Sequence, residues 1–204
     1  GPEMLSFVLK HTPLKMCWVP NYSDYYPEQP GGRAGGRSIE PKPFDAKKLG
    51  PDMAGLEPAY GKVPLNVVVM QQDYVRLNQL KRHPRGVLRS LKVGARTMWA
   101  GMRGKNLVGM GRALIAPMRI GLRQAGVPVL LNTALTDLYI EDGTVRGIYV
   151  RDTTAPESAE PTVIRARRGV ILGSGGFEKN EQMRVKYQRA PITTEWTVGA
   201  KANT

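Results

Sequence analysis

The sequence predicts an α/β fold that combines helices with antiparallel strands, and three observations lead to that prediction. Two long stretches, 84–103 and 109–124, repeat apolar side chains with the period of a helix. The hydrophobic period then changes to two on either side of Asp142-Gly143, a pair that favours a hairpin turn. An apolar stretch over 169–172 leads into a glycine-rich turn and a helix. We expect mixed sheets, with further strands outside these 204 residues.

The first half of the chain is predicted to hold three of the helices. Residues 2–9 place Met4, Leu5, Val8 and Leu9 on one face, and a short strand over 15–19 follows. Residues 20–50 are rich in Gly, Pro and Tyr, which predicts a long surface loop. A helix is expected over 71–82, and Pro84 is suited to the first turn of the next, over 84–103.

Strands dominate the second half, after the predicted helix over 109–124. We expect an apolar strand over 127–132 and a hairpin over 135–140 and 145–151. Two more strands are expected over 162–165 and 169–172. The last helix should begin near residue 178 and turn its apolar side chains toward the core.

The composition is typical of a globular protein and excludes several classes. The sequence is 41% hydrophobic and 23% charged, and Cys17 is its single cysteine, so an intrachain disulfide is excluded. His11 and His83 are far apart and lack partners at metal-ligand spacing, so no metal site is expected. Every apolar run is shorter than the roughly 18 residues that span a bilayer. A cytoplasmic location is therefore the default expectation.

The positive charge is concentrated in one segment. The formal net charge is +13, and the interval between Asp73 and Asp137 holds twelve basic and no acidic residues. Within it, the helix over 84–103 is two-sided and predicts binding to an anionic membrane surface. A solvated surface helix is the plain alternative, and nucleic acid is disfavoured because aromatic and basic residues do not alternate. The residues expected at the membrane surface are Arg85, Arg89, Lys92, Arg96 and Trp99.

Two further motifs allow both a structural and a chemical interpretation. The turn Gly173-Ser174-Gly175-Gly176 could admit a phosphate or ring edge to backbone N–H groups, but Glu178 replaces the third glycine of the dinucleotide fingerprint. A plain structural turn is the favoured interpretation from these residues alone. The cluster Tyr22-Ser23-Asp24-Tyr25-Tyr26 could present phenol hydroxyls for proton transfer. An aromatic anchor for the loop is favoured when the cluster is considered alone.

Several stretches together resemble the 3-ketosteroid Δ1-dehydrogenases of the fumarate reductase and succinate dehydrogenase flavoprotein superfamily. In order along the chain they are Ser23-Asp24-Tyr25-Tyr26-Pro27-Glu28, Gly36-Arg37-Ser38-Ile39-Glu40-Pro41, Gly111-Arg112-Ala113-Leu114-Ile115, Arg168-Gly169-Val170-Ile171-Leu172 with Gly175-Gly176-Phe177-Glu178, and Gly199-Ala200-Lys201-Ala202-Asn203-Thr204. The resemblance implies that residues 1–204 are the second half of a Rossmann-like FAD-binding domain, with the N-terminal glycine-rich unit and the catalytic domain absent. Residues 20–50 would then be an active-site loop, and the chain alone would be inactive.

Family chemistry implies roles for individual residues. Members oxidise a 3-keto-4-ene steroid to the 3-keto-1,4-diene, passing hydride to FAD and a proton to a tyrosine base. By resemblance, Tyr25 supports that base, whereas Tyr22 and Tyr26 line the substrate pocket. The residues expected to contact FAD are Ala134, Ser174, Gly175, Gly176, Ala202, Asn203 and Thr204. Ser174 and Lys201 depart from the residues expected in the family.

The resemblance also implies partners and leaves rivals open. The partners would be a 3-ketosteroid in sterol catabolism, a quinone or dye as electron acceptor, and the absent segments of the same enzyme. Because a steroid substrate is lipophilic, an enzyme that takes it from a membrane would benefit from binding there, and the basic helix is expected to bind the inner membrane face. The rivals are a related flavoenzyme acting on another enone or on a dicarboxylate, and a basic membrane or nucleic-acid binding module without cofactor. A dicarboxylate would need an arginine cluster, which the Asp-Tyr-Tyr loop does not supply.

Overall fold

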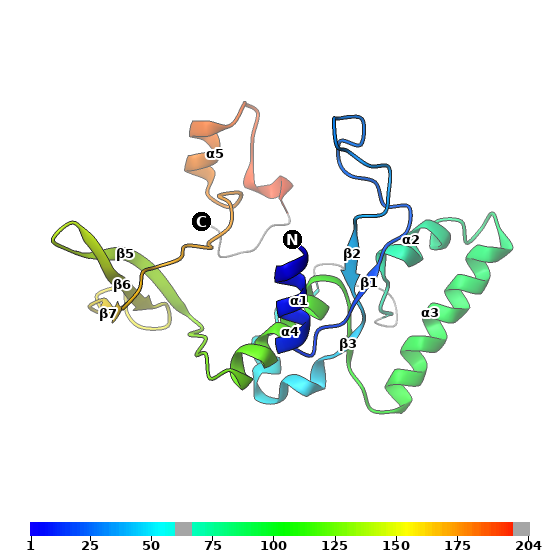
Figure 1. The fold of residues 1–204 in the computed structure, drawn as a ribbon, viewed down its shortest axis with the longest axis horizontal. Helices are drawn as coiled ribbons and strands as arrows, with labels where there is room; N and C mark the ends of the chain where they lie inside the picture. The colour runs from blue at the N-terminus through cyan, green and yellow to red at the C-terminus, as the bar shows by residue number, and fades with distance from the viewer. Residues whose placement is uncertain (60–66, 198–204) are drawn as a thin grey trace. The chain divides into compact units, whose positions relative to one another are not determined.

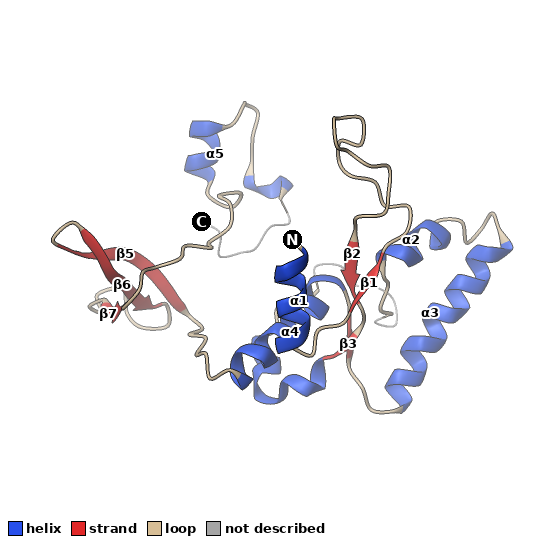
Figure 2. Ribbon diagram, viewed as in Figure 1, coloured by secondary structure: helices blue, strands red, loops and turns tan. Residues whose placement is uncertain are grey.

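The chain forms two compact units. The computed structural model describes residues 1–59 and 67–197, and its units are Gly1–Val129 and Leu130–Thr204 (Figure 1). The expected combination of helices with an antiparallel hairpin is confirmed. Figure 2 shows that most of the described helical residues belong to the first unit and that the longest strands belong to the second.

The first unit is built from helices and two short ladders. β1 (Met16–Trp18) pairs antiparallel with β2 (Ile39–Pro41), and β3 (Phe44–Asp45) pairs antiparallel with β4 (Leu107–Val108). The helices are α1 (Pro2–His11), the 3-10 segment η1 (Ala46–Gly55), α2 (Gln71–Leu77), α3 (Pro84–Met102) and α4 (Met110–Gln124).

Local sequence explains where these helices start and stop. Pro2 and Pro84 stand in the first turns of α1 and α3, where the missing N–H costs nothing. The His83 ring nitrogen Nδ1 accepts the Arg85 amide at 3.0 Å and caps α3. After α4, Gly126 adopts φ +69°, a left-handed conformation that favours glycine at a helix end.

The core of the first unit lies between η1 and α4. Ala46, Val108 and Ala113 form one cluster, and Leu49, Ala116 and Ile120 form a second. Phe44 and Leu56 pack against both clusters and join them. Arg119 and Arg123 of α4 also reach back to Asp52 of η1, at 2.9 and 3.0 Å. The two segments are therefore held by both apolar packing and paired charges.

The predicted loop over 20–50 is shorter than expected. β2, β3 and the start of η1 occupy its second half, so the loop proper covers residues 20–38. The reason is nonlocal: β2 pairs with β1 and β3 with β4, pairings that the local Gly and Pro content does not reveal. The predicted helix over 71–82 likewise ends early, at Leu77, and turns lead from there to His83.

The second unit is a three-stranded antiparallel sheet followed by a short helix. β5 (Thr133–Glu141), β6 (Thr144–Asp152) and β7 (Thr162–Arg165) are ordered β5-β6-β7. Asp142 and Gly143 form the turn between β5 and β6 with φ values of 48° and 71°, as the hairpin prediction requires. α5 (Glu181–Tyr187) and the 3-10 turn η3 (Thr194–Trp196) follow.

Three expectations for the second half of the chain are wrong. Residues 127–132 and 169–172 form no strand, and the Ile171 side chain is 97% exposed. A strand needs a neighbour for its N–H and C=O groups, and neither segment pairs with another among the described residues. Met183 and Tyr187 of α5 are exposed rather than turned toward a core.

The buried face of α4 differs from expectation, and small residues form most of the buried positions of both α3 and α4. In α4 the buried residues are Ala113, Ala116, Pro117, Ile120 and Gly121. The helical spacing of the large apolar residues predicts that Ile115 and Leu122 lie on the buried face, but both are exposed. In α3 the buried positions are Gly86, Val93 and Ala100. Small side chains face inward because they permit close approach, as at Gly86, where an added Cβ would meet the Gln79 backbone at 2.7 Å.

Candidate functional site

The tyrosine loop, residues 20–38, rises from the β1–β2 ladder (Figure 1). Its base is closed by the Val19 amide, which donates to the Ser38 carbonyl at 2.9 Å. Higher up, the Asp24 carboxylate accepts the Arg33 amide at 2.8 Å and forms an ion pair with Arg37. Arg37 and then the Arg33 amide hold the pKa of Asp24 below its usual value. The loop therefore has a defined conformation.

The three tyrosines predicted from the sequence lie together on this loop. Tyr25 is 89% exposed, Tyr26 is exposed and Tyr22 is at the border of exposure. The hydrogen bond between the Tyr22 and Tyr25 side chains raises the pKa of Tyr22. Two hydrogen-bonded phenol groups can transfer a proton between them, or donate a hydrogen bond to a substrate carbonyl.

A groove beside Tyr22 has a wall that the sequence did not predict. Its volume is about 120 Å³, and α2 supplies one side through Gln71, Gln72, Val75 and Arg76. These residues lie about fifty positions from the tyrosines in sequence, and no local motif marks them. The sequence indicated only that residues 71–82 form a helix. It did not indicate that this helix lies beside the tyrosines, because that placement depends on the fold.

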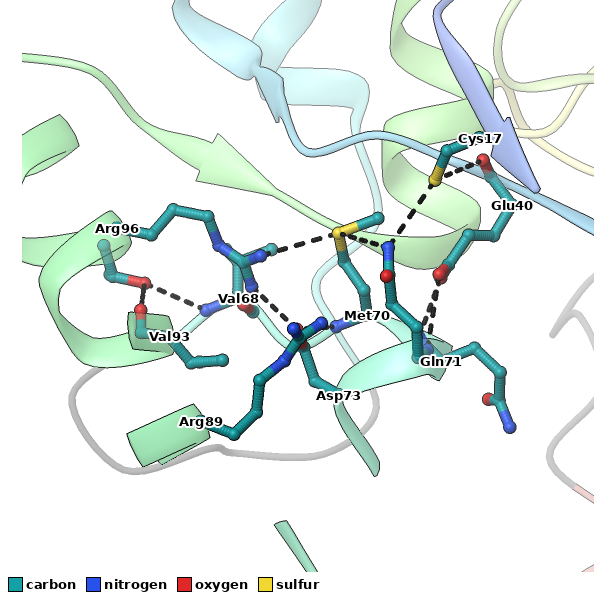
Figure 3. Close-up of polar contacts among 11 residues, drawn as sticks. Cys17, Glu40, Val68, Met70, Gln71, Asp73, Arg89, Val93 and Arg96 are labelled. Atoms are coloured by element: carbon teal, nitrogen blue, oxygen red, sulfur yellow. Dashed lines mark hydrogen bonds and ion pairs between the residues drawn. The ribbon is translucent and has the colours of Figure 1, made fainter. Parts of the chain in front are cut away.

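Glu40 of β2 positions α2 beside the tyrosine loop. Its carboxylate accepts the Gln71 amide at 2.7 Å and the Gln72 amide at 3.4 Å, two amides that a helix start leaves without internal partners. The Cys17 thiol of β1 donates to the Glu40 carbonyl, and the Gln72 side chain contacts Cys17 at 3.8 Å (Figure 3). Burial, and then the charge of Glu40, raise the pKa of Cys17. One acidic residue thus links the loop-bearing ladder to the groove wall.

Asp73 is the most deeply buried charge among the described residues. Its carboxylate accepts the Met70 amide at 2.9 Å and pairs with Arg89 at 2.6 Å and Arg96 at 3.0 Å (Figure 3). Burial alone would raise the pKa of Asp73, but the Met70 amide and the two guanidinium groups lower it overall. Arg96 additionally donates to the Val68 carbonyl. This cluster fastens α2 to α3.

The Asp73 cluster corrects two of the membrane-surface predictions. The side chains of Arg89 and Arg96 are 16% and 28% exposed, and they point inward from α3 toward Asp73. Helical spacing predicts that Arg89 and Arg96 lie on the same face of α3 as the other basic residues. In the structure they turn toward the buried Asp73 carboxylate, because a buried charge needs a partner of opposite charge. Arg85, Lys92 and Trp99 are exposed.

The outward face of α3 is apolar. The Arg103 guanidinium lies over the Trp99 ring, 3.6 Å from its centroid, and Arg85 and Lys92 are exposed on the same helix. A continuous row of exposed apolar side chains on a helix marks a surface that contacts a membrane or another protein. Its exposed side chains are Val87, Leu88, Leu91, Met98, Trp99 and Met102.

The glycine-rich turn of the second unit exposes its backbone. Gly175 has φ +83°, and a Cβ added at Gly173 would meet nothing within 4 Å. Within the described part of the chain, the amides of residues 173–176 donate no hydrogen bond. Exposed amides in a turn with three glycines, at positions 173, 175 and 176, suit the edge of a ring system or a phosphate, so this turn fits FAD.

The other predicted FAD contacts are only partly described. Ala134 is half-buried in β5, opposite Arg151 of β6, so its backbone belongs to the antiparallel sheet. Ser174 and Gly176 are exposed in the turn, and an added Cβ at Gly176 would meet the Glu178 carboxylate at 2.7 Å. The predicted contacts at Ala202, Asn203 and Thr204 lie outside the described residues.

Neither a metal-binding cluster nor a membrane-spanning helix is present among the described residues. Across 1–59 and 67–197, no group of three or more His, Cys, Asp or Glu side chains is placed to hold a metal ion. Over the same ranges no helix combines the length and the apolarity needed to cross a bilayer.

Comparison with known proteins gives a consistent result. The chain is 84% identical over all 204 residues to 3-oxosteroid 1-dehydrogenase of Mycobacterium tuberculosis (strain ATCC 25618 / H37Rv), and spans 36% of that protein. It is 83% identical over the same length to the enzyme of that name from Mycolicibacterium smegmatis, again 36% of it. The resemblance inferred from the sequence motifs is therefore confirmed.

A solved structure is similar across the whole chain. It is 3-ketosteroid Δ1-dehydrogenase from Sterolibacterium denitrificans in complex with 1,4-androstadiene-3,17-dione, with 33% identity and a TM-score of 0.83. The match covers 100% of this chain and 37% of that one. A model of the family described as FAD binding domain matches residues 1–204. The chain therefore belongs to the FAD binding domain family, and its cofactor is FAD.

Proposed function

We propose that these residues are an interior segment of a flavoprotein that removes the C1 and C2 hydrogens of 3-ketosteroids. The observation that carries the proposal is the 84% identity, over the whole chain, to a 3-oxosteroid 1-dehydrogenase. The exposed tyrosine loop supports it, because an enone substrate needs hydroxyl groups near its carbonyl and near the acidic C2 hydrogen. Electrons would leave to a quinone or an artificial dye, within steroid breakdown.

Under this proposal the chain supplies part of the site. FAD, when bound, accepts hydride from the substrate. The chain's own Tyr25 supports the tyrosine base through its hydroxyl, and Tyr22 holds Tyr25 by their shared hydrogen bond. Tyr22 and Tyr26 offer ring faces to an apolar substrate. The groove between Tyr22 and α2 accommodates part of it.

Uncovered apolar surface supports the interior position of the segment. Ile171 and Leu172 form no strand, and Leu130 and Leu131 are exposed in the same unit. In the proposed enzyme, neighbouring strands of the FAD-binding domain cover these side chains. The chain by itself would then be inactive.

Product analysis of the complete enzyme tests this proposal. By complete enzyme we mean the Mycobacterium tuberculosis relative with these 204 residues in place of its matching segment. Incubation with a 3-keto-4-ene steroid and a dye acceptor should yield the 3-keto-1,4-diene, detected as a loss of two mass units. Conversion of a simple cyclic enone but not of the steroid would contradict the substrate class.

A substitution at Gly175 should remove the cofactor. Gly175→Val places a branched side chain at φ +83° in the turn, which strains the backbone and covers the exposed amides. We expect the purified complete enzyme to lose at least about ninety per cent of its flavin, since adding a side chain blocks close backbone approach. The flavin-to-protein absorbance ratio measures this loss.

Gly126→Val is the matched control for that substitution. Gly126 has a similar φ, +69°, with open space around it, but it ends α4 in the first unit. It carries comparable backbone strain away from the turn, so flavin content should be retained. Equal flavin loss in both variants would show that strain, and not the turn, determines binding.

We further propose that the outward face of α3 attaches the enzyme to the cytoplasmic, anionic face of a membrane. The apolar stripe of α3 would enter the headgroup region, with Arg85, Lys92 and Arg103 among the lipid phosphates. The net charge of +13 supports an anionic partner. A lipophilic substrate would reach the enzyme from the same surface.

Co-sedimentation with vesicles tests the membrane proposal. Replacing Leu88, Leu91 and Trp99 with serine should lower the bound fraction at least about tenfold, because each apolar side chain contributes on the order of 1 to 2 kcal/mol of burial. Val185→Ser, at an exposed position of α5, is the control and should bind normally. Undiminished binding of the triple variant, or no binding of the parent enzyme to anionic vesicles at low salt, would refute the proposal.

A further inference from the structure

Asp24 ties three parts of the tyrosine loop together. Its own amide donates to the Arg33 carbonyl at 3.0 Å, and its carboxylate accepts the Arg33 amide at 2.8 Å. The same carboxylate pairs with the Arg37 guanidinium, whose Nε lies 3.4 Å from Oδ1. Residues 24, 33 and 37 are thereby fixed to one another at the waist of the loop. We call the Asp24–Arg37 ion pair the clasp.

The clasp lies next to Tyr25 in the chain. Because the Tyr25 side chain is 89% exposed, packing does little to fix its position. Besides its hydrogen bond with Tyr22, the loop backbone determines where its hydroxyl points. Tyr25 follows Asp24 directly in the chain and precedes the tip of the loop, so the position of Asp24 determines where the Tyr25 backbone begins.

The tip above the clasp is tightly closed. The Gln29 amide donates to the Tyr26 carbonyl at 3.2 Å, and the Gly32 amide donates to the Gln29 carbonyl at 2.8 Å. A Cβ added at Gly32 would meet the Pro27 carbonyl oxygen at 2.7 Å. The tip therefore behaves as one rigid turn, and its orientation depends on its attachment at the waist.

We propose that Asp24 and Arg37 are positioning residues that hold Tyr25 in its working orientation. The inference rests on the proposed function, in which Tyr25 supports proton removal from the steroid. A displacement of a reacting group by about 1 Å can cost up to a hundredfold in rate, so a surface ion pair at this point has an effect beyond stability. The clasp touches neither substrate nor FAD under this proposal.

The test compares arginine variants in the complete enzyme. Arg37→Ala breaks the clasp but keeps the two hydrogen bonds between residues 24 and 33, from the Asp24 amide to the Arg33 carbonyl and from the Arg33 amide to the Asp24 carboxylate. We expect kcat to fall about tenfold with KM within about twofold, since positioning acts on the transition state more than on binding. Arg37→Lys restores the charge and should recover at least half of the lost rate. Melting temperature and flavin content should stay at parental values.

Arg33→Ala is the matched control. Arg33 joins the waist only through its backbone amide and carbonyl, so this variant removes an equal charge from the same loop and leaves the clasp intact. Its kcat should equal that of the parent. A tenfold loss in Arg33→Ala as well would show that loop charge, and not the clasp, matters, and would overturn the inference.

A double variant separates this inference from the proposed function. If the clasp acts through Tyr25, Arg37→Ala should have no further effect on kcat in a Tyr25→Phe background. Full additivity of the two losses would overturn the clasp inference while leaving the role of Tyr25 intact. An unchanged kcat in Tyr25→Phe alone would instead contradict the role proposed for Tyr25, and the inference would fall with it.

Discussion

Replacing Asp73 with alanine should lower the free energy of unfolding by about 3 to 5 kcal/mol, the usual cost of removing one member of a buried ion pair. The carboxylate is buried and holds Arg89, Arg96 and the Met70 amide. Its loss leaves two guanidinium groups poorly paired between α2 and α3. Urea unfolding of the complete enzyme, followed by tryptophan fluorescence, measures the effect.

Glu28→Gln serves as the control for this destabilisation. Glu28 is an exposed acidic residue of the same unit, and its replacement should change the unfolding free energy by less than about 0.5 kcal/mol. If Asp73→Ala were equally mild, the cluster would not be what fastens α2 to α3.

The same cluster predicts how stability depends on pH. The pKa of Asp73 is lowered in the folded protein, so its stabilising contribution is complete above the ordinary carboxyl pKa of about 4. The contribution declines as the pH falls below that value and is lost once the pH passes the folded-state pKa. The unfolding free energy of Asp73→Ala should consequently fall less than that of the parent between neutral pH and pH of about 3.

Tyr25→Phe should lower kcat of the complete enzyme by about a hundredfold, at the lower end of what a positioned proton-transfer group contributes. The substitution keeps the ring and removes only the hydroxyl, and the clasp does not involve the Tyr25 side chain. Flavin content and melting temperature should be unchanged. Steady-state kinetics with a dye acceptor provide the measurement.

Tyr74→Phe is the control, because Tyr74 is an exposed tyrosine of α2 that does not line the groove. Its kcat should match that of the parent. If the Tyr25→Phe enzyme had the parental kcat at every pH, the Tyr25 hydroxyl would have no part in proton transfer, which would contradict its proposed role.

Local signals predicted the elements that depend on local interactions. The Asp142-Gly143 hairpin and the start of α3 at Pro84 were found because turn and cap residues are contiguous in sequence. The strands expected over 127–132 and 169–172 did not form. An apolar run indicates that a segment can form a strand. Whether it does so depends on a partner strand elsewhere in the chain, which the local sequence does not reveal.

The polar contacts of the site could not be predicted in the same way. Asp24 and Arg37 are 13 positions apart, and Glu40 reaches Gln71 across 31. Helical periodicity detected that α3 is two-sided, but it could not say that Arg89 and Arg96 turn inward. That orientation is determined by Asp73, which lies on another helix and was noted only as the boundary of an acid-free segment.

The most direct test of the central claim is the visible absorption spectrum of the complete enzyme under anaerobic conditions, recorded before and after addition of a 3-keto-4-ene steroid. An oxidised flavin band should be present at the start and should bleach in proportion to the steroid added, with formation of the 1,4-diene. A flavin band that the steroid leaves unchanged, or the absence of flavin from the purified protein, would contradict the account.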